Sequence, residues 1–183
     1  NPYLVADFGR KFALGLISQK IMPCLKHFPG HGDVSADSHY SLPVSYKTLN
    51  ELMETELIPY QRLTSLTPFI MTAHILFPNI DPNNMATLSK IFLTDILRGK
   101  LRYKGLIITD SLSMKGILTD SLENIAIKAF NAGNDILLIG GNTLNENDPT
   151  FNIKQVRSLH KNLIKAVKDG RISIERLNES VER

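Results

Sequence analysis

The residues best suited to chemistry lie in one stretch, from Lys26 to Pro43, which reads KHFPGHGDVSADSHYSLP. In it, one residue separates Asp37 from His39, so the carboxylate of Asp37 could accept a ring N–H of His39 and fix its tautomer. A carboxylate in this position also stabilises the imidazolium, which suits His39 to donate and accept protons. The alternative is an ordinary turn, because Asp and Ser both favour turns.

A second candidate, Asp110, directly follows the apolar run from Gly105 to Thr109. A carboxylate held at the end of a strand could attack an electrophilic carbon or stabilise a developing cation. The alternative is that Asp110 caps the next helix. Lys26 and His27 leave an earlier apolar run together and could hydrogen-bond a polar substrate, and His74 follows a third run. These polar residues would converge if the runs are neighbouring parallel strands.

Neither a metal nor a cofactor is expected. His31, between two glycines, is a possible ligand, but His31, Asp37 and His39 lack the spacing of a zinc site. The G-x-S-x-G elbow of serine hydrolases is absent, and no Gly-rich phosphate-binding fingerprint follows the first strand. His160, on a late helix, is expected at the surface.

The composition is that of a globular domain. The chain has 183 residues, 43% of them apolar, and a formal charge of +3 with both signs scattered, so nucleic-acid binding is not indicated. No apolar run approaches the roughly 18–20 residues of a membrane span. No signal peptide is recognisable at the start, and a cytoplasmic location is expected.

The single cysteine, Cys24, lies in an apolar run and is predicted to be a buried thiol.

Amphipathic helices and short apolar strands alternate along the chain. Helices are predicted near residues 4–16, 49–60, 91–97, 125–132 and 156–167, with a short one from Ser173. Strands are predicted at residues 21–25, 69–72, 105–109 and 135–139. Asn1 and Pro2 form a typical helix start, and Pro59 should end or kink the second helix. Gly133 and Gly170 should end two later helices.

Solid apolar strands that alternate with helices predict a parallel sheet covered on both faces. Either an open doubly wound sheet or a (β/α)8 TIM-type barrel would satisfy this pattern. Polar residues after three of the four strands favour the barrel, whose active sites lie at the carboxyl ends of the strands. Four βα units are half of a barrel, so we expect an α/β fold in which this chain holds roughly the second half.

The long loop closely resembles the signature of glycoside hydrolase family 3, in particular the bacterial β-N-acetylhexosaminidase branch, whose loop carries Asp-Ser-His. Other segments are similar to the family's in the same order: MTAH (71–74), ATLS (86–89), GLIITDSLSM (105–114), AGNDILL (132–138) and the tail RISIERLNESVER. The resemblance covers residues 1–183 as a single catalytic domain. The family's early strands, which supply a substrate-binding Asp and Arg, have no counterpart here, so the N-terminal part of the barrel is expected to be missing. The 142–150 loop is longer and more polar than is usual in the family.

The resemblance implies a retaining glycosidase that uses Asp110 as nucleophile and His39, paired with Asp37, as acid/base. It assigns substrate binding to Lys26, His27, His74 and Met114. The implied substrate carries a terminal β-linked N-acetylglucosamine, as in cell-wall muropeptide fragments during peptidoglycan recycling. A family 3 β-glucosidase is disfavoured, because that branch usually takes its acid/base from a second domain. An N-acetylglucosaminide phosphorylase stays open, since a neutral histidine base repels an anionic acceptor less than a carboxylate does.

A half barrel would leave unpaired strand edges, and such edges pair with other strands. The expected partner is the missing N-terminal half or a second copy of the chain, and this chain alone is expected to lack full activity. An inactive sugar-binding fragment is the alternative from a different functional class. The joint presence of Asp37, His39 and Asp110 disfavours that alternative.

Overall fold

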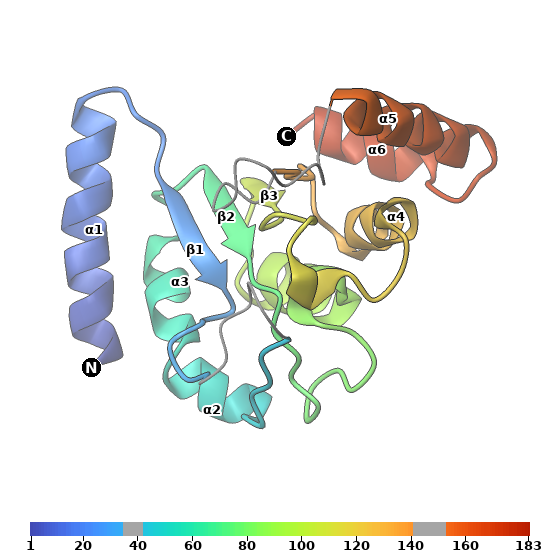
Figure 1. The fold of residues 1–183 in the computed structure, drawn as a ribbon. Helices are drawn as coiled ribbons and strands as arrows, with labels where there is room; N and C mark the ends of the chain where they lie inside the picture. Colours follow the sequence, from blue (N-terminus) through green and yellow to red (C-terminus); the bar gives the residue numbers. More distant parts are fainter. Residues whose placement is uncertain (35–41, 141–152) are drawn as a thin grey trace.

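The computed structural model describes residues 1–34, 42–140 and 153–183. Helices and short strands alternate along the chain (Figure 1). The strands are β1 (Cys24–Phe28), β2 (Phe69–Thr72) and β3 (Leu106–Ile108). The α-helices are α1 (Pro2–Ser18), α2 (Leu49–Glu54), α3 (Leu57–Leu63), α4 (Leu122–Ala132), α5 (Ile153–Lys168) and α6 (Ile174–Val181). Two 3-10 turns, η1 (Ala86–Leu88) and η3 (Lys115–Ile117), and a π-helix, η2 (Ile91–Lys100), complete the set.

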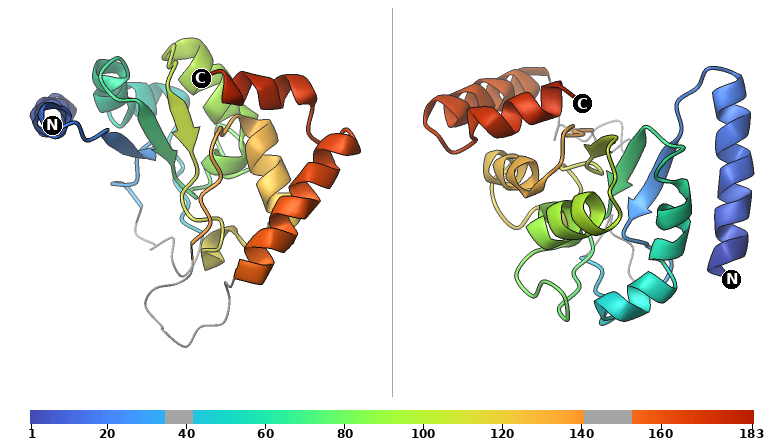
Figure 2. Two further views of the ribbon diagram at one scale, coloured as in Figure 1. Left: turned by 90° about the horizontal axis from the view of Figure 1, so that it is seen from above. Right: turned by 180° about the vertical axis from the view of Figure 1, so that it is seen from behind.

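The three strands form a parallel sheet in the order β1-β2-β3. Ile70 of β2 and Ile107 of β3 pair in register, and both are fully buried beneath α3 and η2 in the main core cluster. Side chains on the opposite face, such as Met71 and Ile108, are only half-buried. Figure 2 shows the helices gathered around one side of the strands. The prediction of a parallel sheet is therefore confirmed, but the prediction that helices cover both faces is wrong for the described residues.

The first strand begins three residues later than predicted. Its ladder starts with the pair Cys24 and Phe69, directly after Pro23, which has no N–H to donate to a sheet. Lys26 and His27 therefore lie within β1, not beyond its end. This register also exposes Cys24, so the prediction of a buried thiol is wrong.

Residues 135–139 run beside β3 but do not form the regular fourth strand that was predicted. One isolated bridge, between Ile108 and Ile136, joins them to the sheet. Side chains replace ladder bonds on both sides of it: the carboxylate of Asp135 accepts the N–H of Ile107, and the hydroxyl of Thr109 accepts the N–H of Leu138. The position of this segment was predicted, whereas its local geometry was not.

Helix boundaries follow their capping residues. The side chain of Asn1 caps α1 as predicted. The break between α2 and α3 falls at Thr55 and Glu56, not at Pro59. Pro59 instead occupies the first turn of α3, where a missing N–H leaves no helical hydrogen bond unmade. Gly133 ends α4, as predicted.

No helix among the described residues is long and apolar enough to cross a membrane.

Helix α1 presents its large apolar side chains outward. It packs on α3, and its small Ala6 and Ala13 are its buried residues. Phe8 and Phe12, which belong to the apolar stripe of this amphipathic helix, are 67% and 71% exposed. Contiguous apolar surface of this kind typically marks an interaction site.

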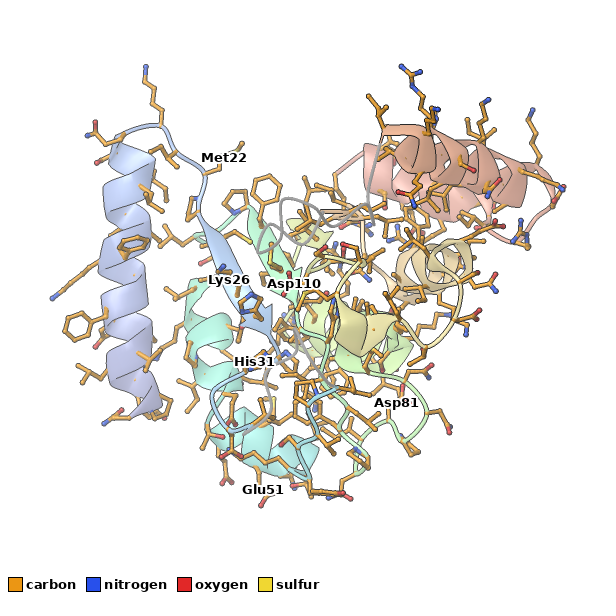
Figure 3. All side chains as sticks on the ribbon, in the orientation of Figure 1. Met22, Lys26, His31, Glu51, Asp81 and Asp110 are labelled. Carbon is orange, nitrogen blue, oxygen red and sulfur yellow. The ribbon has the colours of Figure 1, made fainter. Side chains whose placement is uncertain are left out.

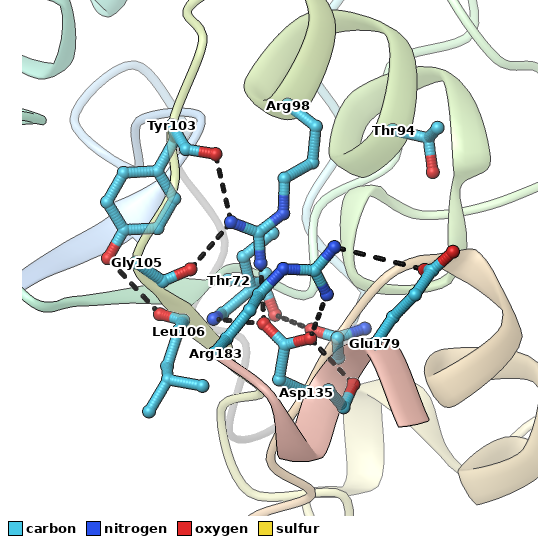
Figure 4. Close-up of polar contacts among 12 residues, drawn as sticks. Thr72, Thr94, Arg98, Tyr103, Gly105, Leu106, Asp135, Glu179 and Arg183 are labelled. Carbon is cyan, nitrogen blue, oxygen red and sulfur yellow. Dashed lines mark hydrogen bonds and ion pairs between the residues drawn. The ribbon is translucent and has the colours of Figure 1, made fainter. Parts of the chain in front are cut away.

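Buried Asp135 anchors the C-terminal helix through a network of polar contacts (Figure 4). Its fully buried carboxylate forms ion pairs with Arg98 of η2 and with Arg176 and Arg183 at the C-terminus. The same carboxylate accepts the N–H of Ile107 in β3 and the hydroxyl of Ser180 in α6. One side chain therefore joins η2, β3 and α6.

Substitution by alanine is expected to change the free energy of unfolding in opposite directions at two glycines, Gly133 and Gly15. Gly133 has a φ of +132°, and a Cβ there would lie 3.1 Å from the Cβ of Leu93. Gly133→Ala should lower the free energy of unfolding by about 1–3 kcal/mol. Gly15 is exposed in α1, and a Cβ added to it would meet no atom within 4 Å, so Gly15→Ala should raise it by about 0.5–1 kcal/mol. Urea unfolding measures both; a stabilised Gly133→Ala protein would contradict the strain argument.

Candidate active site

The carboxyl ends of the three strands bring a cluster of titratable residues together. His27 lies near the end of β1, His74 lies two residues beyond β2, and Asp110 lies two residues beyond β3. The Nε2 atom of His27 is 3.5 Å from Oδ2 of Asp110, and both side chains are about one-quarter exposed, at 28% and 22%. The ring of His31 lies edge-on to that of His27, with centroids 6.0 Å apart. Figure 3 labels His31 and Asp110 in this region, where β1 and β2 end.

Asp110 is held between two anchored residues. Thr109 donates its N–H to the carbonyl of Ile136, and Leu112 donates its N–H to the carbonyl of Leu138. The side chain of Leu112 is fully buried against α4 and α5 in a second core cluster. The N–H of Ser111 donates to Oδ1 of Asp110 at 2.7 Å. This contact occupies one carboxylate oxygen and leaves Oδ2 facing His27.

His74 is buried beneath this cluster, with 1% of its surface exposed. Its Nε2 is 3.0 Å from the carbonyl of Ser111, and its Nδ1 is 2.8 Å from Oγ1 of Thr87. Because a carbonyl only accepts, Nε2 must carry a proton. Burial lowers the pKa of His74, although the Ser111 carbonyl and the charge of Asp110 act in the opposite direction. The ring is therefore neutral near pH 7, as the Nε2–H tautomer.

His27 is also kept neutral. Burial lowers its pKa, the carboxylate of Asp110 raises it, and the charges of Lys26, His31 and His74 lower it. The net direction of the pKa shift is downward. A neutral imidazole beside a carboxylate can donate to or accept from a substrate hydroxyl, depending on its tautomer.

Lys47 tethers the segment that follows β1, a feature that the sequence reasoning missed. Its ammonium pairs with Glu56 and, at 3.2 Å, with Oδ2 of Asp33. Gly30 passes so close to Glu56 that a Cβ on it would lie 2.6 Å from that side chain, and its φ is +139°. In the sequence, Lys47 is one of many lysines scattered among acids, so only the Gly-rich composition of the loop hinted at a close approach.

The remaining predicted site residues are distributed as follows. Lys26 is exposed on β1. Met114 is half-buried in the turn after Asp110, where its N–H donates to the carbonyl of Ser111. His160 is exposed on α5, as expected. Asp37 and His39 lie outside the described residues, so their roles stay predictions. Within residues 1–34, 42–140 and 153–183, no three His, Cys, Asp or Glu side chains are grouped to hold a metal ion.

Buried, neutral His74 predicts a specific pH dependence of stability. Because its folded-state pKa is lowered, the unfolded chain binds the extra proton first as the pH falls, near the ordinary histidine pKa of about 6.5. The free energy of unfolding should therefore fall between pH 7.5 and 5.5, by up to about 1.4 kcal/mol per pH unit from this group. His74→Gln should flatten the slope, and His160→Gln should not. Equal slopes for His74→Gln and the parent protein, measured by urea unfolding, would be evidence against a neutral His74.

Comparisons with known proteins agree on one family. The model of the "Glycosyl hydrolase family 3 N terminal domain" matches residues 1–183. A β-hexosaminidase from Idiomarina loihiensis is 41% identical over 139 residues, which are 75% of this chain and 42% of that protein. The structure of a family 3 β-N-acetylglucosaminidase from Paenibacillus sp. FPU-7 is 34% identical, with a TM-score of 0.88 over 99% of this chain and 33% of its own. The structure of a β-glucoside phosphorylase is 28% identical, with a TM-score of 0.84 over 99% of this chain and 32% of its own. The chain thus spans well under half the length of these proteins.

Proposed function

Because this chain belongs to the family defined by the glycosyl hydrolase family 3 N-terminal domain, we propose that it carries the catalytic residues of a retaining glycosidase. The substrate would be a sugar with a terminal β-linked N-acetylglucosamine. The observation that carries the proposal is the half-buried carboxylate of Asp110, anchored at the strand ends within 3.5 Å of His27. Relatives named β-hexosaminidase and β-N-acetylglucosaminidase support this choice of sugar.

The proposed mechanism has two steps. Oδ2 of Asp110 attacks the anomeric carbon, while His39 protonates the departing glycosidic oxygen, giving a covalent glycosyl-enzyme. His39 then takes a proton from water, which attacks the same carbon and restores the original configuration. Asp37 would hold the tautomer of His39 and stabilise its imidazolium. The Ser111 N–H on Oδ1 supports the choice of Oδ2 as the attacking atom, because Oδ2 is the oxygen that this N–H leaves free.

Sugar contacts would come from Lys26, His27 and Met114. The ring of His27 is beside Oδ2 of Asp110, so its Nε2 would meet a hydroxyl close to the reacting carbon. The exposed ammonium of Lys26, one residue earlier on β1, would reach a more distant hydroxyl. We further propose that the natural substrates are muropeptide fragments of the cell wall, processed in the cytoplasm.

We also propose that the chain forms about half of a (β/α)8 barrel and needs the other half or a second copy. Helices pack on one face of the sheet, and the opposite face is half-exposed. In the described residues β1 has no strand on its outer edge, and α1 exposes Phe8 and Phe12. A complete barrel would cover the exposed face of the sheet, the outer edge of β1 and the apolar side of α1.

The barrel proposal predicts how the 183-residue chain behaves alone. It should self-associate, because its apolar surfaces and open edge have no cover. Size-exclusion chromatography with light scattering measures the mass. A compact, stable monomer of 20.5 kDa would contradict the proposal.

The test of function is turnover of 4-nitrophenyl β-N-acetylglucosaminide by the full-length gene product. We expect release of the sugar with retained configuration. His39→Ala should slow it about 10²–10⁴-fold, and azide should rescue this variant by attacking the glycosyl-enzyme. Cleavage of the glucoside alone would overturn the choice of sugar, and binding without cleavage would favour an inactive sugar-binding protein.

A phosphorylase is the second candidate, because a phosphorylase structure is similar to this chain and because a histidine base carries no negative charge to repel phosphate. Running the same assay in phosphate distinguishes the two reactions. Formation of N-acetylglucosamine 1-phosphate in place of the free sugar would favour the phosphorylase.

A further inference from the structure

His74 has no ring nitrogen left for a substrate. Its Nδ1 is bonded to Thr87 and its Nε2 to the carbonyl of Ser111, and the side chain is 1% exposed. A sugar contact, the role that the sequence resemblance implied, would require one of these bonds to break. The geometry of this buried ring suggests a different role.

Ser111 connects His74 to the candidate nucleophile. The N–H of Ser111 donates to Oδ1 of Asp110 at 2.7 Å, and its carbonyl accepts the Nε2–H of His74 at 3.0 Å. The residue after Asp110 is thus fixed on both sides of its Cα. A rotation of the Ser111 backbone would carry the N–H away from the carboxylate, so the bond from His74 also restrains the direction of Oδ2.

The far side of the ring is equally constrained. Oγ1 of Thr87, fully buried, accepts the hydroxyl of Thr72 of β2 at 3.1 Å and lies 2.8 Å from both Nδ1 of His74 and the carbonyl of Ala73. Because Nδ1 is unprotonated in the Nε2–H tautomer, the contact with His74 uses the single hydroxyl proton of Thr87. The carbonyl of Thr87 accepts an N–H of Asn134 at 2.9 Å. A chain of hydrogen bonds therefore runs from β2 through Thr87 and His74 to the loop that carries Asp110.

We propose that His74 is a positioning residue, which orients the carboxylate of Asp110 through the Ser111 backbone and does not touch the sugar. This inference rests on the proposed role of Asp110 as nucleophile. Its signature is kinetic: losing a positioning bond lowers kcat and leaves KM nearly unchanged, whereas losing a sugar contact raises KM.

The test compares two pairs of variants in the full-length gene product with 4-nitrophenyl β-N-acetylglucosaminide. His74→Leu should lower kcat about 10–100-fold with KM within about threefold. His74→Gln, whose amide can donate near the Nε2 position, should recover most of that loss. Thr87→Val should lower kcat about tenfold, because Nδ1 loses its partner, and Thr87→Ser should restore it. The rate of covalent labelling by an activated fluoro-sugar should fall in parallel with kcat.

Three outcomes would overturn the inference: an unchanged kcat in His74→Leu, a rise in KM that accounts for the loss in kcat/KM, or equal defects in Thr87→Val and Thr87→Ser. If His74→Leu does not fold, the Thr87 pair carries the test. Nitrogen-15 NMR of the histidine rings checks the bond without any substrate. A slowly exchanging Nε2 proton of His74, with Nδ1 unprotonated, is expected even if the wild type proves inactive, which would count against the proposed function alone.

Discussion

Asp110→Asn should lower turnover of 4-nitrophenyl β-N-acetylglucosaminide by about 10³-fold or more, with no change in fold. Asparagine has the same shape, and its carbonyl oxygen can still accept the Ser111 N–H that now binds Oδ1. What it lacks is a negative charge on the atom that faces His27, so under the proposed mechanism no glycosyl-enzyme should form. Initial rates of the full-length gene product measure the effect.

The matched control is Asp120→Asn, in the exposed turn before α4, where the carboxylate pairs with Lys128 and accepts from Asn124. This variant should retain wild-type rates. Mass spectrometry after treatment with a fluoro-sugar should place the adduct on the peptide that contains Asp110. More than a tenth of the activity in a freshly prepared Asp110→Asn protein, or an adduct on another peptide, would assign the nucleophile elsewhere.

Asp135→Asn should destabilise the protein far more than the loss of an exposed charge does. The side chain is fully buried, and its ion pairs with Arg98, Arg176 and Arg183 measure 2.5, 3.3 and 2.9 Å. Removing the charge leaves three guanidinium groups crowded together without a carboxylate at their centre. We expect a loss of about 3 kcal/mol, which corresponds to a fall in Tm of about 6–12 °C for a chain of this size.

The control for this variant is Glu179→Gln. Glu179 is 59% exposed and lies 3.9 Å from both Arg176 and Arg183. Exposed pairs contribute little, so its loss should stay within about 1 kcal/mol. Thermal unfolding of the two proteins side by side measures the difference. Equal Tm values for the two variants would show that the buried ion pairs of Asp135 contribute no more to stability than the exposed pairs of Glu179.

The sequence predicted local elements better than it predicted what covers them. Gly133 and Asn1 fixed the boundaries of helices because capping depends on neighbouring residues alone. The start of β1 was misplaced because apolar character continues through Ile21 and Met22, while sheet pairing begins only after Pro23. The helix α1 was predicted correctly, but the spacing of its apolar residues could not show that Phe8 and Phe12 would be exposed.

For the candidate active site, too, some features could be predicted from the sequence and others could not. The position of Asp110 after a buried strand was visible in the sequence, and the structure confirms that position. The ring environment of His74 was not visible, since its partners Thr87 and Ser111 are 13 and 37 residues away. The ion pair between Lys47 and Glu56 joins residues 9 positions apart, on either side of α2, and leaves no periodic signal in the sequence.

The network around Asp135 also bears on how the chain folds as it leaves the ribosome. Arg98 precedes Asp135, but Arg176 and Arg183 are made 41 and 48 residues later. Because domains fold N-terminal parts first during synthesis, Arg98 is available to Asp135 before Arg176 and Arg183 are. The segment beside β3 can therefore close fully only after α6 emerges. The strands are therefore synthesised well before the helix α6 that completes the polar contacts of Asp135 beside them.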